Sequence, residues 1–341
     1  MKRVAFFDTK RYDRKWFDEL EKSFEIKYFK EKLNPENADL AKGFDGVVAF
    51  VNDRINSKTI RILAENGVSI LAMRCAGYNN INFKAAHEYG LKVVRVPVYS
   101  PYAVAEHAMA LLLTLNRKIH KAYNRTRDFN FSLKNLTGFD LHGKTMGIIG
   151  TGKIGQIFIR ICQGFGMKVI AYDPYPIENA DFEYVSLDRL LCESDAISLH
   201  CPLTPDTHHV LNAEAFEKMK SNVFIINTSR GGLIDSEALL NALKSQKVAG
   251  AGLDVYEEEA ELFFEDFSEK IVDDDILARL VSMPNVILTS HQAFLTEEAL
   301  KNIAEITIAN LEDYFAGREL NNQVCYDCTE QMPTTDCSKC Q

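Results

Sequence analysis

The sequence predicts an α/β fold of two doubly wound domains, each a parallel sheet with helices on both faces. Short apolar runs alternate with helical patterns along most of the 341 residues, which is typical of repeated βαβ units. The expected strands are almost continuously hydrophobic, as strands covered on both faces are. A polar stretch over 125–144 separates two such series, and the length also favours two domains.

The first series contains five expected strands, three expected helices between them and one long apolar helix. The strands are expected at 4–7, 26–29, 46–51, 69–73 and 93–96. The shorter helices are expected at 13–22, 58–67 and 83–88. The long helix begins near Pro101, because proline is favoured in a first turn and no breaker interrupts the apolar residues through Leu115.

The second series begins at Thr145 and contains six expected strands, about as many as one doubly wound domain with two halves. These strands are expected at 145–149, 169–172, 196–199, 223–227, 249–254 and 286–289. A final helix over 296–315 is long enough to return to the first domain. We therefore expect one domain from 1–100 with 297–341, including a cysteine-rich tail over 322–341, and a second domain from 101–296.

Composition excludes several classes of protein. Hydrophobic residues make up 46% and charged residues 26%, as in ordinary globular proteins, and the net charge is -9. An acidic chain without a basic cluster is a poor candidate for binding nucleic acid or an anionic membrane. No apolar run reaches the length of a bilayer span, and the apolar start is too short for a signal peptide. We expect a cytoplasmic protein in which Cys75, Cys162, Cys192 and Cys201 are small core residues.

A glycine-rich turn joins an expected strand to an expected helix at Gly150-Thr151-Gly152-Lys153-Ile154-Gly155. Gly150 suits a tight turn, Gly152 allows a pyrophosphate to approach the backbone, and Gly155 lets the helix pack close to the strand. Alone, such a turn can be merely structural. Its position between a strand and a helix favours a dinucleotide site.

Two further features favour NAD at this turn. The N–H groups of Lys153 and Ile154 would lie at a helix N-terminus, where anions bind. Asp173 lies 18 residues beyond the last glycine at the end of the next strand, where a carboxylate accepts hydrogen bonds from a ribose. The same carboxylate would repel a 2′-phosphate, which argues against NADP.

Three polar groups follow later strands of the second series. They are Arg230 within 227–232, an acidic run within 254–261, and His291 within 290–294. Because the carboxyl ends of parallel strands share one edge of a sheet, these groups should lie beside the nicotinamide. Arginine can hold a carboxylate and histidine can exchange a proton near neutral pH. Each residue alone could be structural or solvated, but their co-location favours catalysis.

The chain resembles the D-isomer-specific 2-hydroxyacid dehydrogenases, and within them the fermentative D-lactate dehydrogenase branch. The motifs that carry the resemblance are 150–155, 227–232, 252–257 and 291–294, and Phe294 with 263–266 resembles the lactate branch. The resemblance implies a flavodoxin-like substrate-binding domain and a Rossmann NAD-binding domain with a cleft between them. It covers roughly residues 1–320.

The resemblance also assigns roles to individual residues. The implied catalytic residues are Arg230, Glu259 and His291, and Glu259 is thereby selected from the acidic run. Implied cofactor contacts, together with the glycine turn and Asp173, are Cys201, Pro202, Thr207, Thr228, Ser229, Arg230 and Asp254. Implied substrate contacts are Phe50, Ala76, Gly77, Tyr99, Arg230, His291 and Phe294.

The expected activity is reversible reduction of pyruvate to D-lactate by NADH, with no metal in the active site. Another short 2-oxo acid is an alternative substrate. A less favoured alternative is an NAD-sensing binding protein similar to the C-terminal binding protein corepressors, which carry long disordered tails that this chain lacks. The resemblance implies a homodimer or homotetramer, with the helix after Pro101 and the 125–144 stretch in the interface.

The family pattern does not account for the last cysteines, Cys325, Cys328, Cys337 and Cys340. They form two C-x2-C pairs separated by eight residues, a spacer shorter than is usual for zinc sites. A structural zinc site, disulfide or redox pairs, and free thiols all remain open.

Overall fold

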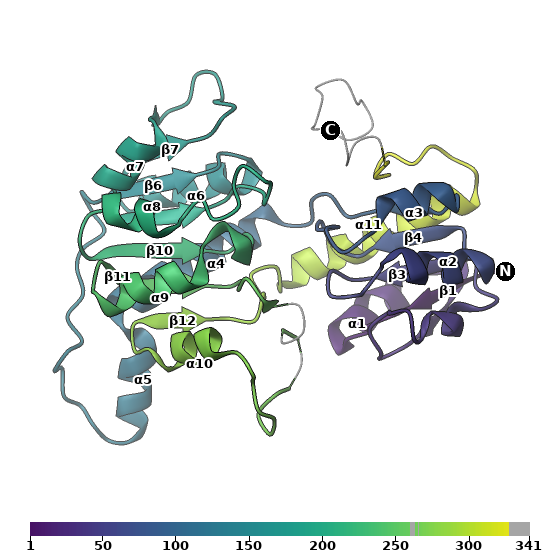
Figure 1. Ribbon diagram of the computed structural model, residues 1–341, viewed down its shortest axis with the longest axis horizontal. Helices are drawn as coiled ribbons and strands as arrows, with labels where there is room; N and C mark the ends of the chain where they lie inside the picture. The colour runs from purple at the N-terminus through teal and green to yellow at the C-terminus, as the bar shows by residue number, and fades with distance from the viewer. Residues whose placement is uncertain (260–262, 265, 327–341) are drawn as a thin grey trace. The chain divides into compact units, whose positions relative to one another are not determined.

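The chain divides into two compact units, Met1–Ser100 with Leu295–Gln341 and Pro101–Phe294. The computed structural model describes residues 1–259, 263–264 and 266–326. Each unit is a parallel sheet flanked by helices, which confirms the predicted α/β fold class (Figure 1).

The first unit contains a five-stranded parallel sheet in the order β2-β1-β3-β4-β5. Its strands are β1 (Lys2–Phe6), β2 (Phe24–Tyr28), β3 (Gly46–Ala49), β4 (Ile70–Met73) and β5 (Lys92–Val94). Its helices are α1 (Arg11–Leu20), α2 (Ser57–Glu65), α3 (Phe83–Glu88) and α11 (Glu297–Phe315). The order changes direction between β1 and β3, as in a doubly wound sheet.

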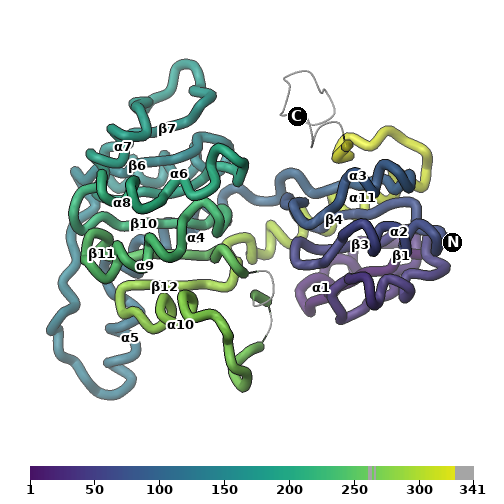
Figure 2. Tube along the Cα trace, viewed as in Figure 1, coloured from purple at the N-terminus to yellow at the C-terminus, as the bar shows by residue number. Residues whose placement is uncertain are grey.

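The final helix completes the core of this unit. Phe6 and Phe17 pack with Ile308 and Leu311, so α1 and α11 bury one face of the sheet. Figure 2 shows the yellow-green α11 beside the purple N-terminal elements. Thr296 caps α11 by accepting a hydrogen bond from the N–H of Ala299, which explains where the helix begins.

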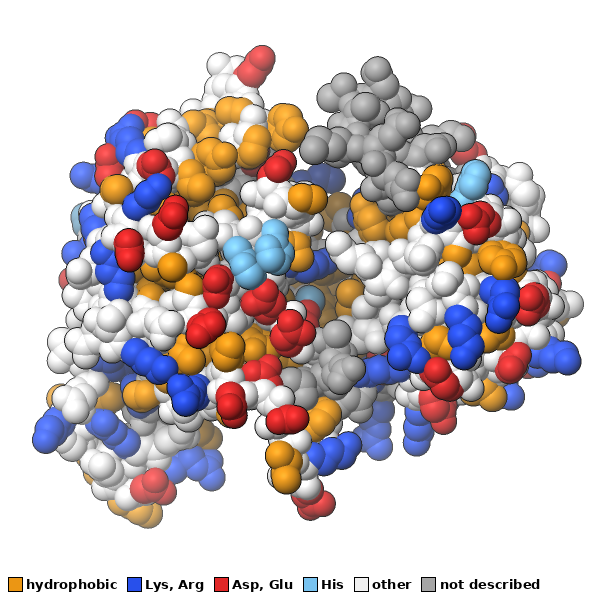
Figure 3. Space-filling model, viewed as in Figure 1, with side chains coloured by type: hydrophobic (Ala, Val, Ile, Leu, Met, Phe, Trp, Pro, Cys, Tyr) orange, Lys and Arg blue, Asp and Glu red, His pale blue; other side chains and the backbone are white. Residues whose placement is uncertain are grey.

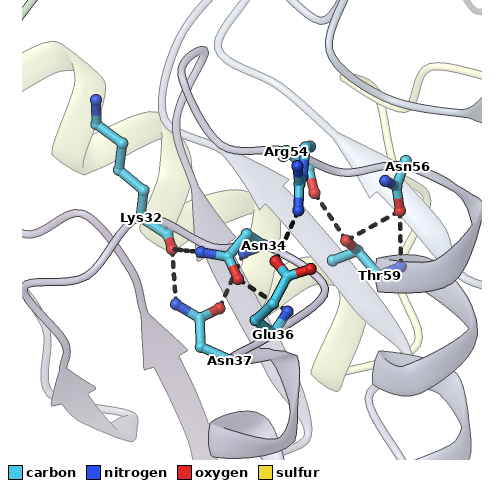
Figure 4. A network of polar contacts seen from close by, with 7 residues as sticks. All are labelled: Lys32, Asn34, Glu36, Asn37, Arg54, Asn56 and Thr59. Carbon is cyan, nitrogen blue, oxygen red and sulfur yellow. Dashed lines mark hydrogen bonds and ion pairs between the residues drawn. The ribbon is translucent and has the colours of Figure 1, made fainter. Parts of the chain in front are cut away.

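A polar network stabilises the loop after β2 and the start of α2 (Figure 4). The side chain of Asn37 donates to the carbonyl of Lys32 at 2.7 Å, and Arg54 pairs with Glu36 at 2.7 Å. The hydroxyl of Thr59 donates to the carbonyl of Arg54 at 2.7 Å. These contacts join the loop to the segment that precedes α2.

The second unit contains a seven-stranded parallel sheet in the order β12-β11-β10-β9-β6-β7-β8. Its strands are β6 (Thr145–Ile149), β7 (Lys168–Tyr172), β8 (Glu183–Tyr184), β9 (Ala196–Leu199), β10 (Val223–Asn227), β11 (Val248–Leu253) and β12 (Val286–Leu288). The expectation of six strands was therefore wrong. The strand it missed, β8, has two residues and no apolar run that could have revealed it.

Two hydrophobic cores cover the two faces of this sheet. Its helices are α4 (Pro101–Arg117), α5 (Ile119–Arg127), α6 (Lys153–Gly164), α7 (Leu187–Glu193), α8 (Ala213–Lys218), α9 (Ser236–Lys244) and α10 (Asp275–Ser282). One core is built from α4 and α6, with Leu112 and Phe158 fully buried. The other is built from α7 to α10, with Phe216 and Leu239 buried. The chain reverses its direction across the sheet between β6 and β9, which places a topological switch point there.

The cysteines differ in part from expectation. Cys75 and Cys162 are buried and Cys201 is half-buried, but Cys192 is exposed, so its assignment to the core was wrong. Cys192 lies near the end of α7, on the side of that helix away from the buried Leu190 and Leu191. Cys325 is a half-buried free thiol, whereas Cys328, Cys337 and Cys340 lie outside the described residues.

No helix in the described part of the chain combines the length and the apolar character needed to cross a bilayer.

Candidate active site

The glycine turn follows β6 and uses each glycine for a different physical reason. Gly150 has φ +97°, and a Cβ on it would lie 2.6 Å from backbone atoms of His200 and Cys201. A Cβ on Gly155 would lie 2.2 Å from the carbonyl oxygen of Gly150, so the helix can approach the strand only without a side chain. A Cβ on Gly152 would meet no atom within 4 Å among the described residues. Open space at Gly152 is what close approach of a pyrophosphate requires.

The start of α6 is suited to an anion. Gly152 is its N-cap and contributes no side-chain hydrogen bond, while Lys153 begins the helix. The first N–H groups of a helix lack partners within it, and the helix dipole favours negative charge there. The N–H groups of Lys153 and Ile154 can therefore donate hydrogen bonds to a phosphate, as expected from the sequence.

Asp173 lies directly after β7 and faces the same turn. One of its carboxylate oxygens accepts hydrogen bonds from the N–H of Thr151 at 2.7 Å and its hydroxyl at 3.0 Å. The other accepts from the N–H of Tyr175 at 2.9 Å. These contacts hold the carboxylate beside the glycine turn while leaving acceptor capacity for a ribose hydroxyl.

The loop after β10 carries Arg230 on a braced backbone. The side-chain amide of Asn227 donates to the carbonyl of Arg230 at 2.8 Å and its oxygen accepts from the N–H of Ser229 at 3.0 Å. The Ser229 hydroxyl donates to the carbonyl of Leu199 at 2.8 Å, which ties the loop to β9. The half-buried guanidinium of Arg230 donates to the carbonyl of Ser229 at 2.8 Å. Among the described residues, no carboxylate forms an ion pair with Arg230, so the positive charge of this side chain can attract an anion.

Thr228 supports ligand binding at the same loop. Its hydroxyl is buried and has no hydrogen-bond partner within the described parts of the chain. A buried polar atom without a partner is costly, and in native proteins such an atom calls for an explanation. A cofactor group that hydrogen-bonds to this hydroxyl would satisfy it. Together with the open space at Gly152, this makes the residues present fit a dinucleotide.

His291 and Glu259 are brought together from different loops. The Nδ1 atom of His291 lies 2.8 Å from a carboxylate oxygen of Glu259, and the two side chains are 18% and 17% exposed. The other oxygen of Glu259 accepts from the N–H of Tyr256 at 2.9 Å. Because Nδ1 is engaged by the carboxylate, the Nε2 atom of His291 is the one that can exchange a proton with a ligand.

Asp254 organises the loop that carries His291. Its fully buried carboxylate accepts hydrogen bonds from the hydroxyl of Thr289 at 2.5 Å and from the N–H groups of Gln292 at 2.9 Å and Ala293 at 2.8 Å. Burial alone would raise the pKa of Asp254, but the contact with His107 and these hydrogen bonds outweigh it and hold the pKa below its usual value. Sequence reasoning expected a cofactor contact here and did not anticipate this supporting role.

The same loop holds His291 in an uncommon conformation. The N–H of His291 donates to the carbonyl of Asp254 at 2.7 Å, and its φ is +52°. Left-handed backbone is uncommon for residues other than glycine and is often found at functional sites. The conformation follows directly from the Asp254 contacts, which fold the chain tightly after β12.

The remaining expected cofactor contacts lie in the segment after β9. Cys201 is half-buried, and burial raises the pKa of its thiol to about 11, so it is a neutral group. The hydroxyl of Thr207 donates to the carbonyl of Pro202 at 2.7 Å and accepts from the N–H of Thr204 at 2.7 Å. Thr207 is therefore occupied in shaping its own turn.

The expected substrate contacts of the first unit follow neighbouring strands of its sheet. Phe50 follows β3, Ala76 and Gly77 follow β4, and Tyr99 follows β5. Phe50 is buried, with the Arg74 guanidinium 4.0 Å from the centre of its ring. The carboxyl ends of the strands thus gather these residues at one edge. Phe294, in the second unit, is also buried.

A buried ionic cluster beneath this edge was not anticipated. The guanidinium of Arg74 is 2% exposed and lies 3.4 Å from the carboxylate of Asp13 and 3.8 Å from that of Asp8. Its Nη2 atom donates a hydrogen bond to the backbone carbonyl of Asp8 at 2.7 Å. Asp53 accepts from the N–H groups of Phe50 and Leu33, and burial raises its pKa to about 7. The sequence pattern did not reveal this cluster, because charged residues are seldom buried and become so here only with partners from distant segments.

Comparison with known proteins agrees with this geometry. A family model described as the D-isomer specific 2-hydroxyacid dehydrogenase, NAD binding domain, matches residues 109–293. A D-lactate dehydrogenase of Escherichia coli (strain K12) is 51% identical over 327 residues, covering 94% of this chain and 99% of its own. This chain belongs to the D-isomer specific 2-hydroxyacid dehydrogenase family. The resemblance stated from the motifs is thus confirmed, and NAD is the cofactor of this dehydrogenase.

Solved structures of relatives have the same fold. The apo structure of the Escherichia coli D-lactate dehydrogenase matches this family member with a TM-score of 0.87 at 49% identity, covering 94% of this chain and 99% of that one. The pyruvate reductase of Chlamydomonas reinhardtii gives a TM-score of 0.90 at 45% identity, covering 94% and 98%.

Proposed function

We propose that this 2-hydroxyacid dehydrogenase interconverts pyruvate and D-lactate with NAD. The observation that carries the proposal is the His291–Glu259 pair on the sheet edge that also presents Arg230, whose charge no carboxylate of the described residues neutralises. A proton donor and a fixed cation at one edge are what reduction of a 2-oxo acid requires. The names of the half-identical relatives support lactate as the hydroxy acid.

Each catalytic residue has a distinct proposed role. Arg230 binds the substrate carboxylate and polarises the adjacent carbonyl through its guanidinium. When bound, NADH supplies the hydride that forms the C–H bond at C2. His291 gives its Nε2 proton to the carbonyl oxygen as that oxygen gains charge, and Glu259 orients and stabilises the imidazolium. In lactate oxidation the same proton returns to His291.

The cofactor contacts are proposed from the turn and the loop after β10. The N–H groups at the start of α6 hold the pyrophosphate, and Asp173 accepts from the adenosine ribose. The unpartnered hydroxyl of Thr228 meets a further polar group of the cofactor. The other expected cofactor contacts stay predictions; they are Cys201, Pro202, Thr207, Ser229 and Asp254.

Substrate selection is proposed to depend on aromatic side chains. Phe50, Tyr99 and Phe294 stay predicted substrate contacts, and an aromatic side chain beside the substrate C3 would favour a methyl group over a longer chain. The roles of Ala76 and Gly77 as backbone donors stay a prediction. Steady-state rates with pyruvate, 2-oxobutyrate, oxaloacetate and phenylpyruvate test this selection, and pyruvate should have the highest kcat/KM.

Replacing His291 tests the proposed reaction. His291→Gln should lower kcat for pyruvate reduction by about 100-fold or more, because general acid catalysis contributes about that much. His142→Gln, at an exposed histidine before β6, is the matched control and should retain the parent rate. A rate for His291→Gln within a few-fold of the parent, or an L-lactate product, would contradict the assignment.

We also propose a homodimer or homotetramer in the cytoplasm. Phe129, Phe131 and Leu133 are 84%, 71% and 82% exposed in the segment after α5, and such apolar surface supports burial against another copy. The described cysteines are all free thiols, which suits a reducing compartment. Sedimentation measurements of the parent and of a Phe129→Ser/Leu133→Ser variant test the assembly, and the variant should dissociate.

A further inference from the structure

A histidine pair and a carboxylate meet outside the residues assigned to hydride transfer. His208, His209 and Glu257 each offer one ligand atom, and these atoms all lie within 4.8 Å of one another. On the face shown in Figure 3, pale-blue histidine side chains lie open to solvent beside red acidic ones. Two imidazoles with one carboxylate are a donor set that Zn²⁺ and its neighbours in the first transition row prefer.

The two histidines are held on a shaped turn. The N–H groups of His208 and His209 donate to the carbonyls of Thr204 and Gly232, both at 2.9 Å. The φ of His209 is +51°, and the two rings stack with centroids 3.9 Å apart and planes 26° apart. The stacking places the imidazole of His208 near the same carboxylate, that of Glu257, which the imidazole of His209 contacts.

Glu257 is oriented as a metal-binding carboxylate would be. One oxygen lies 2.5 Å from Nε2 of His209, and the other accepts a hydrogen bond from the hydroxyl of Ser236 at 3.1 Å. Ligating carboxylates and imidazoles are commonly fixed by such outer hydrogen bonds. Within the described residues, no lysine or arginine pairs with Glu257, and its side-chain partners are the His209 imidazole and the Ser236 hydroxyl.

The cluster needs little movement to close around an ion. Two metal bonds of about 2.1 Å at a tetrahedral angle place their donor atoms about 3.4 Å apart. His208 is exposed and can swing by the required distance of at most about 1.4 Å. His209 and Glu257 are half-buried and 2.5 Å apart, so an ion between them requires a separation of about 1 Å more. Three protein ligands would leave a fourth position for water.

We propose that His208, His209 and Glu257 form a binding site for one Zn²⁺-class divalent cation. The ion joins the turn after β9 to the segment after β11. Glu257 is two residues before Glu259, so the site lies next to the catalytic loop without using its residues. This site is independent of the proposed substrate.

Cobalt titration tests the site in the full-length chain. Cys325, Cys328, Cys337 and Cys340 are replaced by serine so that thiolates cannot compete for the metal. Co²⁺ should then bind at about one equivalent per chain, with the visible absorption of a tetrahedral or five-coordinate ion and no thiolate charge-transfer band. Zn²⁺ should displace it.

Variants decide whether these residues are the ligands. His208→Gln and Glu257→Gln should each weaken Co²⁺ binding by at least about 10-fold, while His142→Gln should leave it unchanged. Circular dichroism checks that the variants are folded, and His208→Gln should be so because its side chain is exposed. Less than about a tenth of an equivalent bound, or binding that survives both ligand variants, would overturn the proposal.

Discussion

Replacing Asp254 by asparagine should damage both stability and catalysis, although the change removes only one charge. The carboxylate accepts from Thr289 and Gln292 at one oxygen and from Ala293 at the other. An asparagine keeps one acceptor but places an NH2 group against at least one of these donors, whichever way the amide is turned. No water can compensate readily, because Asp254 is fully buried.

The magnitude follows from the hydrogen bonds lost. A bond to a charged group contributes about 1.5–3 kcal/mol, and an unsatisfied buried donor costs about 1–3 kcal/mol. We expect Asp254→Asn to lower the free energy of unfolding of this unit by about 3 kcal/mol. The backbone of Asp254 also holds the N–H of His291, so a shift of this loop should reduce kcat by about 10-fold to 100-fold.

Urea unfolding and steady-state pyruvate reduction measure the two effects. Asp188→Asn is the matched control, because Asp188 is exposed and pairs with Lys218 at the surface, and it should change stability by less than about 0.5 kcal/mol. The pKa of Asp254 is lowered in the folded state, so its stabilisation is present above the usual value of 3.8 and is lost as the pH falls through the folded value. The free energies of unfolding of the parent and the variant should therefore converge at acid pH. A variant with parental stability and kcat at pH 7 would refute the reasoning.

Three further predictions concern Gly155, Gly152 and the buried Asp53. Gly155→Ala should destabilise the second unit by about 2–3 kcal/mol in thermal or urea unfolding, because its methyl group would overlap a backbone oxygen 2.2 Å away. Gly152→Ala should fold normally but bind NADH at least about 10-fold more weakly in a fluorescence titration, since the methyl group occupies the open space at the turn; equal affinity would contradict the pyrophosphate assignment. The pKa of Asp53 is raised from 3.8 to about 7, so the folded chain retains a proton that the unfolded chain releases, and parental stability should fall between about pH 4 and pH 7. Asp53→Asn should reduce that pH dependence in urea unfolding, and an unchanged profile would show that another group causes it.

Local patterns predicted those parts of the fold and site that depend on neighbouring residues. The strand-turn-helix around Gly150 could be predicted because each glycine answers a constraint within a few residues of it. The starts of α2 and α11 could be predicted to within one residue, since Asn56 and Thr296 are caps of a common type. Signals of this kind depend only on residues that are close in the sequence.

Contacts between distant segments could not be predicted in this way. Nothing local distinguishes Glu259 from the other acids of its run, because what distinguishes it is a hydrogen bond to a histidine 32 residues later. The carboxylate of Asp254 accepts hydrogen bonds from N–H groups of the segment after β12 and contacts His107 on α4. The pairing of His209 with Glu257 likewise spans 48 residues. These contacts exist only after the sheet brings strand ends together.

The same contacts explain which groups of the second unit remain available to ligands. Asn227 braces the Arg230 backbone, Tyr256 holds Glu259, and Asp254 fixes the His291 loop, so most polar groups around the site are already paired within the chain. A site whose supporting groups are satisfied does not need to reorganise when charge develops on a substrate. The groups left to act are the Arg230 guanidinium, Nε2 of His291, the Thr228 hydroxyl and the N-terminus of α6. One cation and one proton donor match a 2-oxo acid, and a hydroxyl and a helix N-terminus match a dinucleotide, so the groups available to ligands and the proposed reaction have the same chemistry.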